Sequence, residues 1–131
     1  MLNFKTILLI AVLLIGVYSV GYSSEKDKEL SFEDEFVIEK GYYQPYYFQL
    51  EESDLLDVLV ETEGTPIDVY LLDSNNFNQL ESNGTFEYYQ FRGNSIKTQI
   101  KFEAPNYDTY YIVFESLNSD AKVKFNYTAY Y

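Results

Sequence analysis

The chain has 131 residues, among them 21 acidic and nine basic side chains, and its formal net charge is −12. It contains neither cysteine nor histidine, which excludes disulfides, thiolate metal sites and every catalytic arrangement built on a histidine base or a cysteine nucleophile. Nucleic acid is excluded as a partner because binding phosphates requires a basic surface.

The N-terminus has the charge and hydropathy pattern of an export signal. Lys5 is followed by residues 6–24, which carry no charge and have a strongly apolar centre at residues 7–15. A basic start, an apolar stretch and a polar remainder are typical of a signal peptide or a signal anchor. The sequence therefore predicts that residues 1–24 are a signal peptide or a signal-anchor helix.

Cleavage and retention of this segment are both compatible with its residues. The small residues Ser19 and Gly21 precede a possible cleavage site at Tyr22, as in signal peptides. Residues 6–24 are also long enough to cross a hydrocarbon core of about 30 Å as a helix. Either way residues 25–131 are expected outside the cytoplasm, secreted in the first case and membrane-anchored through residues 6–24 in the second.

The remainder of the chain divides into a short linker and one domain. Residues 25–33 are charged and show no clear period, so we expect a linker or a stalk there. Residues 34–131 are rich in aromatic and β-branched side chains at alternate positions and are numerous enough for one core. With 21 acidic and eight basic side chains, residues 25–131 carry a formal net charge of −13. Cations, basic proteins and neutral glycans therefore remain possible partners.

Period-two alternation predicts about eight strands, separated by turns that contain Gly, Pro, Asn or Asp. The expected strands are residues 35–40, 46–51, 56–61, 67–72, 86–91, 95–103, 109–115 and 122–130. One apolar and one polar face per strand is typical of antiparallel sheets, and no amphipathic helix is expected after residue 24. The predicted fold is all-β, an antiparallel, jelly-roll-like β-sandwich preceded by an N-terminal hydrophobic helix.

Four sequence motifs occur in the order found in a known domain family. They are Tyr-Tyr-Phe-Gln-Leu at 46–50, Leu-Asp-Val-Leu-Val at 56–60, Pro-Ile-Asp-Val-Tyr-Leu-Leu-Asp at 66–73, and Ala104-Pro105 followed by Thr-Tyr-Tyr-Ile-Val at 109–113. In this order the chain resembles the pre-peptidase C-terminal (PPC) domain of secreted peptidases and, more distantly, the GOLD domain. The resemblance implies an extracellular, non-catalytic β-sandwich that binds or spaces, without peptidase activity.

The only candidate metal ligands are carboxylates near one turn. Glu51, Glu52, Asp54 and Asp57 lie close together in the sequence, and carboxylates at a turn can bind Ca²⁺, which prefers six to eight oxygen ligands. The alternative is a solvated acidic loop. No other cofactor is expected.

Outward-facing tyrosines are candidates for a contact surface. Because neighbouring strand residues face opposite ways, Tyr47, Tyr70 and Tyr111 are expected to point outward, where they could receive a protein or a glycan. The alternative is cross-strand packing on a half-exposed sheet. Asn83 and Asn126 each begin an Asn-X-Thr motif and are possible glycosylation sites of an exported chain.

These features favour a non-catalytic, exported module for binding or structure at the cell surface, with a protein or a glycan as partner. An alternative is an accessory subunit of a membrane complex that is held by the N-terminal helix. A small carboxylate-dependent hydrolase is the third possibility, although the sequence marks no nucleophile.

Overall fold

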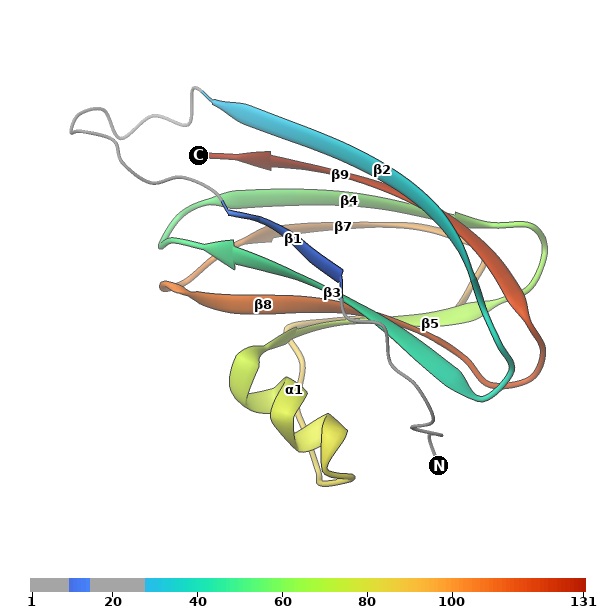
Figure 1. Cartoon of the computed structure of the whole chain (residues 1–131). Coiled ribbons are helices and arrows are strands. Elements are labelled where there is room, and N and C mark those ends of the chain that lie inside the picture. Colours follow the sequence, from blue (N-terminus) through green and yellow to red (C-terminus); the bar gives the residue numbers. More distant parts are fainter. Residues whose placement is uncertain (1–9, 15–27) are drawn as a thin grey trace.

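The computed structural model describes residues 10–14 and 28–131. Two β-sheets pack face to face, and a short helix lies outside one of them (Figure 1). We call sheet A the one that contains β3 (Tyr42–Leu50), β8 (Asp108–Ser116), β5 (Ile67–Asp73) and β6 (Gln90–Ser95). Sheet B contains β2 (Glu29–Ile38), β9 (Ala121–Tyr130), β4 (Leu55–Thr62) and β7 (Lys97–Glu103).

The eight strands β2 to β9 pair in an antiparallel manner within their sheets. Their spatial order is β3-β8-β5-β6 in sheet A and β2-β9-β4-β7 in sheet B, which is the strand order of a jelly roll. The prediction of an all-β sandwich of about eight antiparallel strands is thus confirmed.

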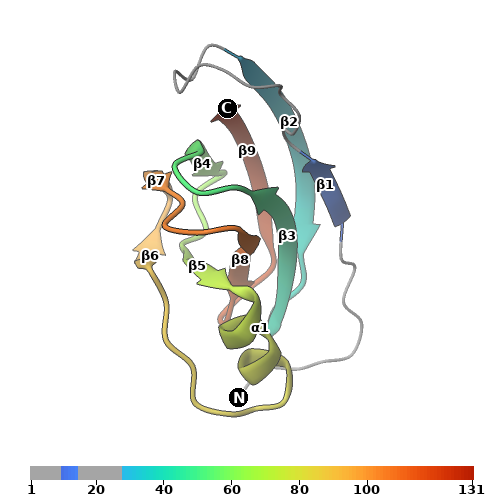
Figure 2. The same cartoon turned by 90° about the vertical axis from the view of Figure 1, so that its left-hand side faces the viewer.

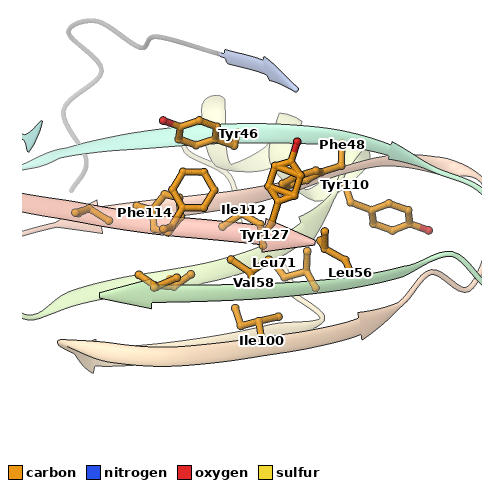
Figure 3. Close-up of a cluster of buried hydrophobic side chains, with 14 of the residues drawn as sticks. Tyr46, Phe48, Leu56, Val58, Leu71, Ile100, Tyr110, Ile112, Phe114 and Tyr127 are labelled. Atoms are coloured by element: carbon orange, nitrogen blue, oxygen red, sulfur yellow. The ribbon is translucent and has the colours of Figure 1, made fainter. Parts of the chain in front are cut away.

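Aromatic side chains dominate the core between the two sheets (Figure 3). Tyr46 and Phe48 of β3 face Phe125 and Tyr127 of β9, and all four are almost completely buried. Their rings meet edge-on, with centroid distances of 4.6 Å for Tyr46–Phe125 and 4.8 Å for Phe48–Tyr127, as aromatic pairs prefer. Burial of these large rings supplies the stabilisation that a domain without disulfides requires.

The described part of the expected N-terminal helix has a different structure. Ile10–Leu14 form strand β1, which pairs in parallel with β3. A short apolar run rich in Ile, Val and Leu is compatible with a strand as well as with a helix, and the expectation of a helix is wrong for these five residues. The rest of the expected signal or anchor lies outside the described residues, and no helix within residues 10–14 and 28–131 is long and apolar enough to cross a membrane.

Strand β2 begins earlier than the sequence indicated. It starts at Glu29, and its pairing with β9 runs from Glu29–Tyr130 to Ile38–Ala121. Residues 29–33, which we expected in the linker, are therefore part of the sheet. Leu30 and Phe32 do alternate with polar residues there, but many charges around them conceal the period.

The strand expected at 86–91 is shifted, and the one expected at 95–103 is divided. Strand β6 starts only at Gln90, because the segment before it crosses the outer face of sheet A. Ile96 separates β6 from β7 at the point where the chain passes from sheet A to sheet B.

Helix α1 (Ser74–Glu81) was not expected from the sequence. Asp73 caps its N-terminus, since the carboxylate accepts a hydrogen bond from the Asn76 N–H at 2.9 Å. Only Phe77 and Leu80 are buried, so an eight-residue helix gives too few apolar positions for a visible period. The helix lies on the side of sheet A that faces away from sheet B (Figures 1 and 2).

Candidate binding surface

The outer faces of the two sheets differ in charge. On sheet B, cross-strand neighbours alternate in sign, as in the row Glu35, Lys124, Glu61 and Lys97. Opposite charges in such pairs offset each other. The outer face of sheet B is therefore a solvated surface on which lysines offset part of the acidic charge.

Sheet A and α1 have almost no positive charge to offset their carboxylates. Within their described strands and helix, the one basic residue is Arg92, whose guanidinium donates to Gln90 Oε1 at 2.9 Å and to the Phe91 carbonyl at 3.2 Å. Their acidic residues are Asp68, Asp73, Glu81, Asp108 and Glu115. The described strands and helix on this side thus carry five carboxylates against one basic side chain, whereas the strands of sheet B carry seven carboxylates against four lysines.

Helix α1 covers part of the outer face of sheet A. Phe77 stacks on Tyr111 with a centroid distance of 3.9 Å and an interplanar angle of 7°. Tyr47 lies across from Tyr111 on the neighbouring strand, with their ring centroids 6.0 Å apart. Of the tyrosines proposed for a contact surface, Tyr47 and Tyr111 therefore lie together and half-buried, and Tyr111 packs against a small second core beneath the helix.

Tyr70, the third of these tyrosines, packs against the same second core and also belongs to a group of rings that reaches β6. We call this group the aromatic patch, and it consists of Tyr70, Phe86, Tyr88 and Phe91. Ring centroids lie 5.6 Å apart for Tyr70–Phe86, 6.0 Å for Tyr70–Tyr88, 4.9 Å for Tyr70–Phe91 and 5.5 Å for Tyr88–Phe91. Tyr88 is 51% exposed and Phe91 37% exposed. Large rings that are both clustered and exposed are characteristic of recognition surfaces.

Three members of the patch were not predicted from the sequence, because residues 86–91 were expected to form a strand. Phe86 and Tyr88 instead come from the segment between α1 and β6. Gly93 follows on β6, and a Cβ atom at this position would lie 2.8 Å from two carbons of the Phe91 ring. The Arg92-Gly93 pair is thus a sequence signal for a close approach of a ring to the backbone.

A buried carboxylate lies behind the patch. Glu115 is only 7% exposed, and the Tyr70 hydroxyl donates a hydrogen bond to its Oε1 at 3.2 Å. Burial raises the pKa of Glu115, and the neighbouring charge of Asp68 raises it further, whereas the bond from Tyr70 lowers it. Burial and the Glu115 charge also raise the pKa of Tyr70, so its phenol stays protonated as the donor.

Asp68 lies directly beside Glu115, as its cross-strand neighbour on β5. Its Oδ1 accepts a hydrogen bond from the Asn94 N–H at 2.8 Å, which orders the backbone after Phe91. The aromatic patch is therefore bordered by two carboxylates on adjacent strands.

The four carboxylates proposed for calcium have separate structural roles. Asp54 is buried and accepts from the Glu51 N–H at 2.8 Å, while Asp57 accepts from Gln99 Nε2 at 2.8 Å. Glu51 and Glu52 are exposed. Among residues 10–14 and 28–131, no group of three or more acidic side chains could hold a metal ion. The structure thus does not bring the four together as one set of ligands.

The two possible glycosylation sites lie in different settings. Asn83 is exposed just after α1, with a positive φ of 60°, a conformation that Asn tolerates better than most residues. Asn126 is half-buried in β9, between Glu33 of β2 and Leu59 of β4. Both remain predictions, and Asn83 is the more accessible.

One family model and two solved structures are similar to this chain. The model of the bacterial pre-peptidase C-terminal domain matches residues 42–116, which run from β3 to the end of β8. The pre-peptidase C-terminal domain of a Bacillus anthracis collagenase is 17% identical, with a TM-score of 0.55 over 75% of this chain and 89% of that one. PliG of Aeromonas hydrophila, a periplasmic inhibitor of g-type lysozyme, is 8% identical, with a TM-score of 0.59 over 94% and 96%. At these identities the two structures share the fold, and no curated protein matches this chain.

Proposed function

Because the chain belongs to the bacterial pre-peptidase C-terminal domain family, we propose that it is an exported, non-catalytic module that binds a protein partner at the cell surface. The aromatic patch is the observation that carries this proposal. Its exposed members Tyr88 and Phe91 offer a large apolar area with few rotatable bonds, which is the kind of side chain that dominates binding energy in interfaces.

Three further features support a role in binding. The chain has no histidine or cysteine, and so lacks the commonest catalytic base and a thiol nucleophile. The basic side chains of the described strands are distributed unevenly, with four lysines on sheet B and Arg92 alone on sheet A, which favours an oriented encounter with a charged partner. PliG, with the same fold, inhibits a lysozyme, which is compatible with a protein as the partner.

Export follows from the residues that precede the domain. Lys5 and the uncharged residues 6–24 have the pattern of a targeting segment. We propose that this segment carries residues 25–131 out of the cytoplasm, either as a cleaved signal or as an anchor. N-terminal sequencing of the mature protein distinguishes these: a start near Tyr22 indicates secretion, and an intact start in the membrane fraction indicates an anchored module.

The binding proposal is tested with variants of the full chain on intact cells of the producing organism. We expect Tyr88→Ala to weaken binding of the labelled protein several-fold, because it removes an exposed ring from the patch. Tyr107→Ala is the matched control, since Tyr107 is 67% exposed in the turn before β8, outside the patch. Equal binding by wild type and Tyr88→Ala would contradict the proposal.

A glycan array with the same proteins tests the other class of partner. Under the proposal the array stays blank while binding to cells depends on the patch. Patch-dependent binding to a glycan would replace the protein partner by a sugar.

A further inference from the structure

We propose that the aromatic patch receives a cationic side chain, lysine or arginine, of a basic partner protein. This inference rests on the proposed binding function and adds the chemistry of the group that is bound. It is carried by the placement of exposed rings beside one buried and one half-buried carboxylate, in a sheet whose described strands hold a single basic side chain.

Three rings of the aromatic patch lie close enough together to contact one cation. Tyr70, Tyr88 and Phe91 form a triangle whose centroid separations are 4.9, 5.5 and 6.0 Å. A cation within about 6 Å of a ring centroid is attracted by the negative face of the ring. Several rings at these separations can contact one ammonium or guanidinium group together.

Two carboxylates place negative charge next to these rings. Glu115 accepts from the Tyr70 hydroxyl and lies beside Asp68, so negative charge is fixed behind the phenol ring. A phenol that donates to a carboxylate is polarised toward greater electron density, which strengthens attraction of a cation to its face. Because Glu115 is nearly buried, water screens its charge less than that of a surface carboxylate.

The basic side chains of the described strands have other partners. Of the four lysines of β7 and β9 on sheet B, three lie opposite acidic neighbours and Lys122 forms an ion pair with Glu63 at 3.6 Å. Arg92 donates to Gln90 and to the Phe91 carbonyl. None of these basic groups neutralises Asp68 and Glu115. Charge complementarity thus favours a basic partner over a second copy of this acidic chain.

An oligolysine peptide is the probe for this inference, and the matched peptide with every lysine acetylated is the uncharged ligand. Affinities for the full chain are measured by fluorescence anisotropy at low salt. We expect binding of oligolysine but not of the acetylated peptide.

The variants separate attraction to a ring from attraction to charge alone. Tyr88→Ala and Phe91→Leu should each weaken oligolysine binding about fivefold, since leucine keeps apolar area but lacks the ring quadrupole. Asp68→Asn should weaken it as well, because it removes one charge while keeping the Oδ1 acceptor for Asn94. Tyr107→Ala should bind like the wild type, and thermal melts establish that each variant is folded.

Two results would overturn the inference. The first is that oligolysine binds Phe91→Leu and Tyr88→Ala with wild-type affinity. This result would mean that the negative charge of the protein alone attracts the peptide and that the rings do not contribute. The second is an equal loss in Tyr107→Ala. If binding to cells depends on Tyr88 while oligolysine binding does not, the cationic ligand is wrong and the binding function stands. If cell binding is independent of Tyr88, both fail.

Discussion

Two phenol–carboxylate pairs show how this tyrosine-rich, acidic chain accommodates its polar groups. Tyr46, fully buried, donates to Asp34 Oδ2 at 2.6 Å, and Tyr70 donates to Glu115. In each pair a protonated phenol supplies the donor that elsewhere would come from lysine or arginine. Alternation along the strands predicted that Tyr70 faces outward, and this is confirmed. The partners were not predictable, because Tyr70 and Glu115 are 45 positions apart and only the pairing of β5 with β8 brings them together.

At the residue scale, we expect Tyr46→Phe to lower the free energy of unfolding by about 2 kcal/mol, as for loss of a hydrogen bond to a charged acceptor. The bond joins β3 of sheet A to β2 of sheet B, so its loss weakens the packing of the two sheets. Urea denaturation measures the change. Asp34→Asn, which keeps an acceptor, should cost less, and a Tyr46→Phe protein as stable as wild type would contradict the assigned role.

A second prediction at this scale concerns pH. Burial raises the pKa of Glu115 in the folded state above its ordinary value of 4.5. At a pH between 4.5 and the raised pKa, the folded state therefore binds more protons than the unfolded state. The contribution of Glu115 to stability therefore rises as pH falls through this window. We expect Glu115→Gln to stabilise the protein at neutral pH and to reduce the gain in stability on acidification.

Glu87→Gln is the matched control for this pH dependence, because it removes the same charge from an exposed position. Both variants lower the overall repulsion of the acidic chain equally. Urea unfolding at neutral pH and near the ordinary carboxyl pKa distinguishes them. Identical pH profiles for the two variants would show that Glu115 is not destabilised by its burial.

At the scale of elements, the sequence was most informative where one face of a strand is apolar and the other polar. Strand β9 alternates Val123, Phe125 and Tyr127 with Lys122 and Lys124, and it was expected almost at its true bounds. Helix α1 was missed because two buried residues in eight do not define a period. The segment before β6 was mistaken for a strand because its rings suit a sheet, yet they pack on Tyr70 from outside. The aromatic patch depends on this tertiary packing, which local patterns do not contain.

The helix gives a prediction at this scale. Phe77→Ala should lower the free energy of unfolding by about 3 kcal/mol, as is usual for truncating a buried aromatic ring. It removes the ring stacked on Tyr111 and one of the two buried side chains by which α1 packs on sheet A. Chemical denaturation measures the loss. Asn78→Ala on the exposed side of α1 is the control and should be nearly neutral.

A result near zero for Phe77→Ala would mean that α1 contributes little to the fold. Hydrogen exchange of β8 in the same variant adds a second readout. We expect faster exchange in β8 around Tyr111 and Val113, whose outer faces the helix covers.

At the scale of the whole molecule, charge is divided between the two faces. Composition gave the net charge of the exported part as −13, but only the sheet order places the lysines of β7 and β9 together on sheet B. The helix-bearing side of sheet A keeps its carboxylates without such partners. This division gives the module one side on which carboxylates lie beside exposed rings and another on which lysines alternate with carboxylates.

The division predicts salt-sensitive binding. Raising the ionic strength from low to about 1 M shortens the screening length from tens of ångströms to about 3 Å. The affinity of the protein for cells should therefore fall at high salt, mainly because the association rate decreases. Surface-binding kinetics at several salt concentrations measure this. Binding that is insensitive to salt would indicate a partner recognised by apolar contacts alone.

The central claim is that contact is made through the aromatic patch on the outer side of sheet A. Hydroxyl-radical labelling of the full chain, free and bound to cells, tests it most directly. The account predicts that Tyr88 and Phe91 become protected on binding, whereas Leu59 and Val37, which are 45% and 61% exposed on the outer face of sheet B, stay reactive. Protection of Leu59 and Val37 with unchanged labelling of Tyr88 and Phe91 would contradict it.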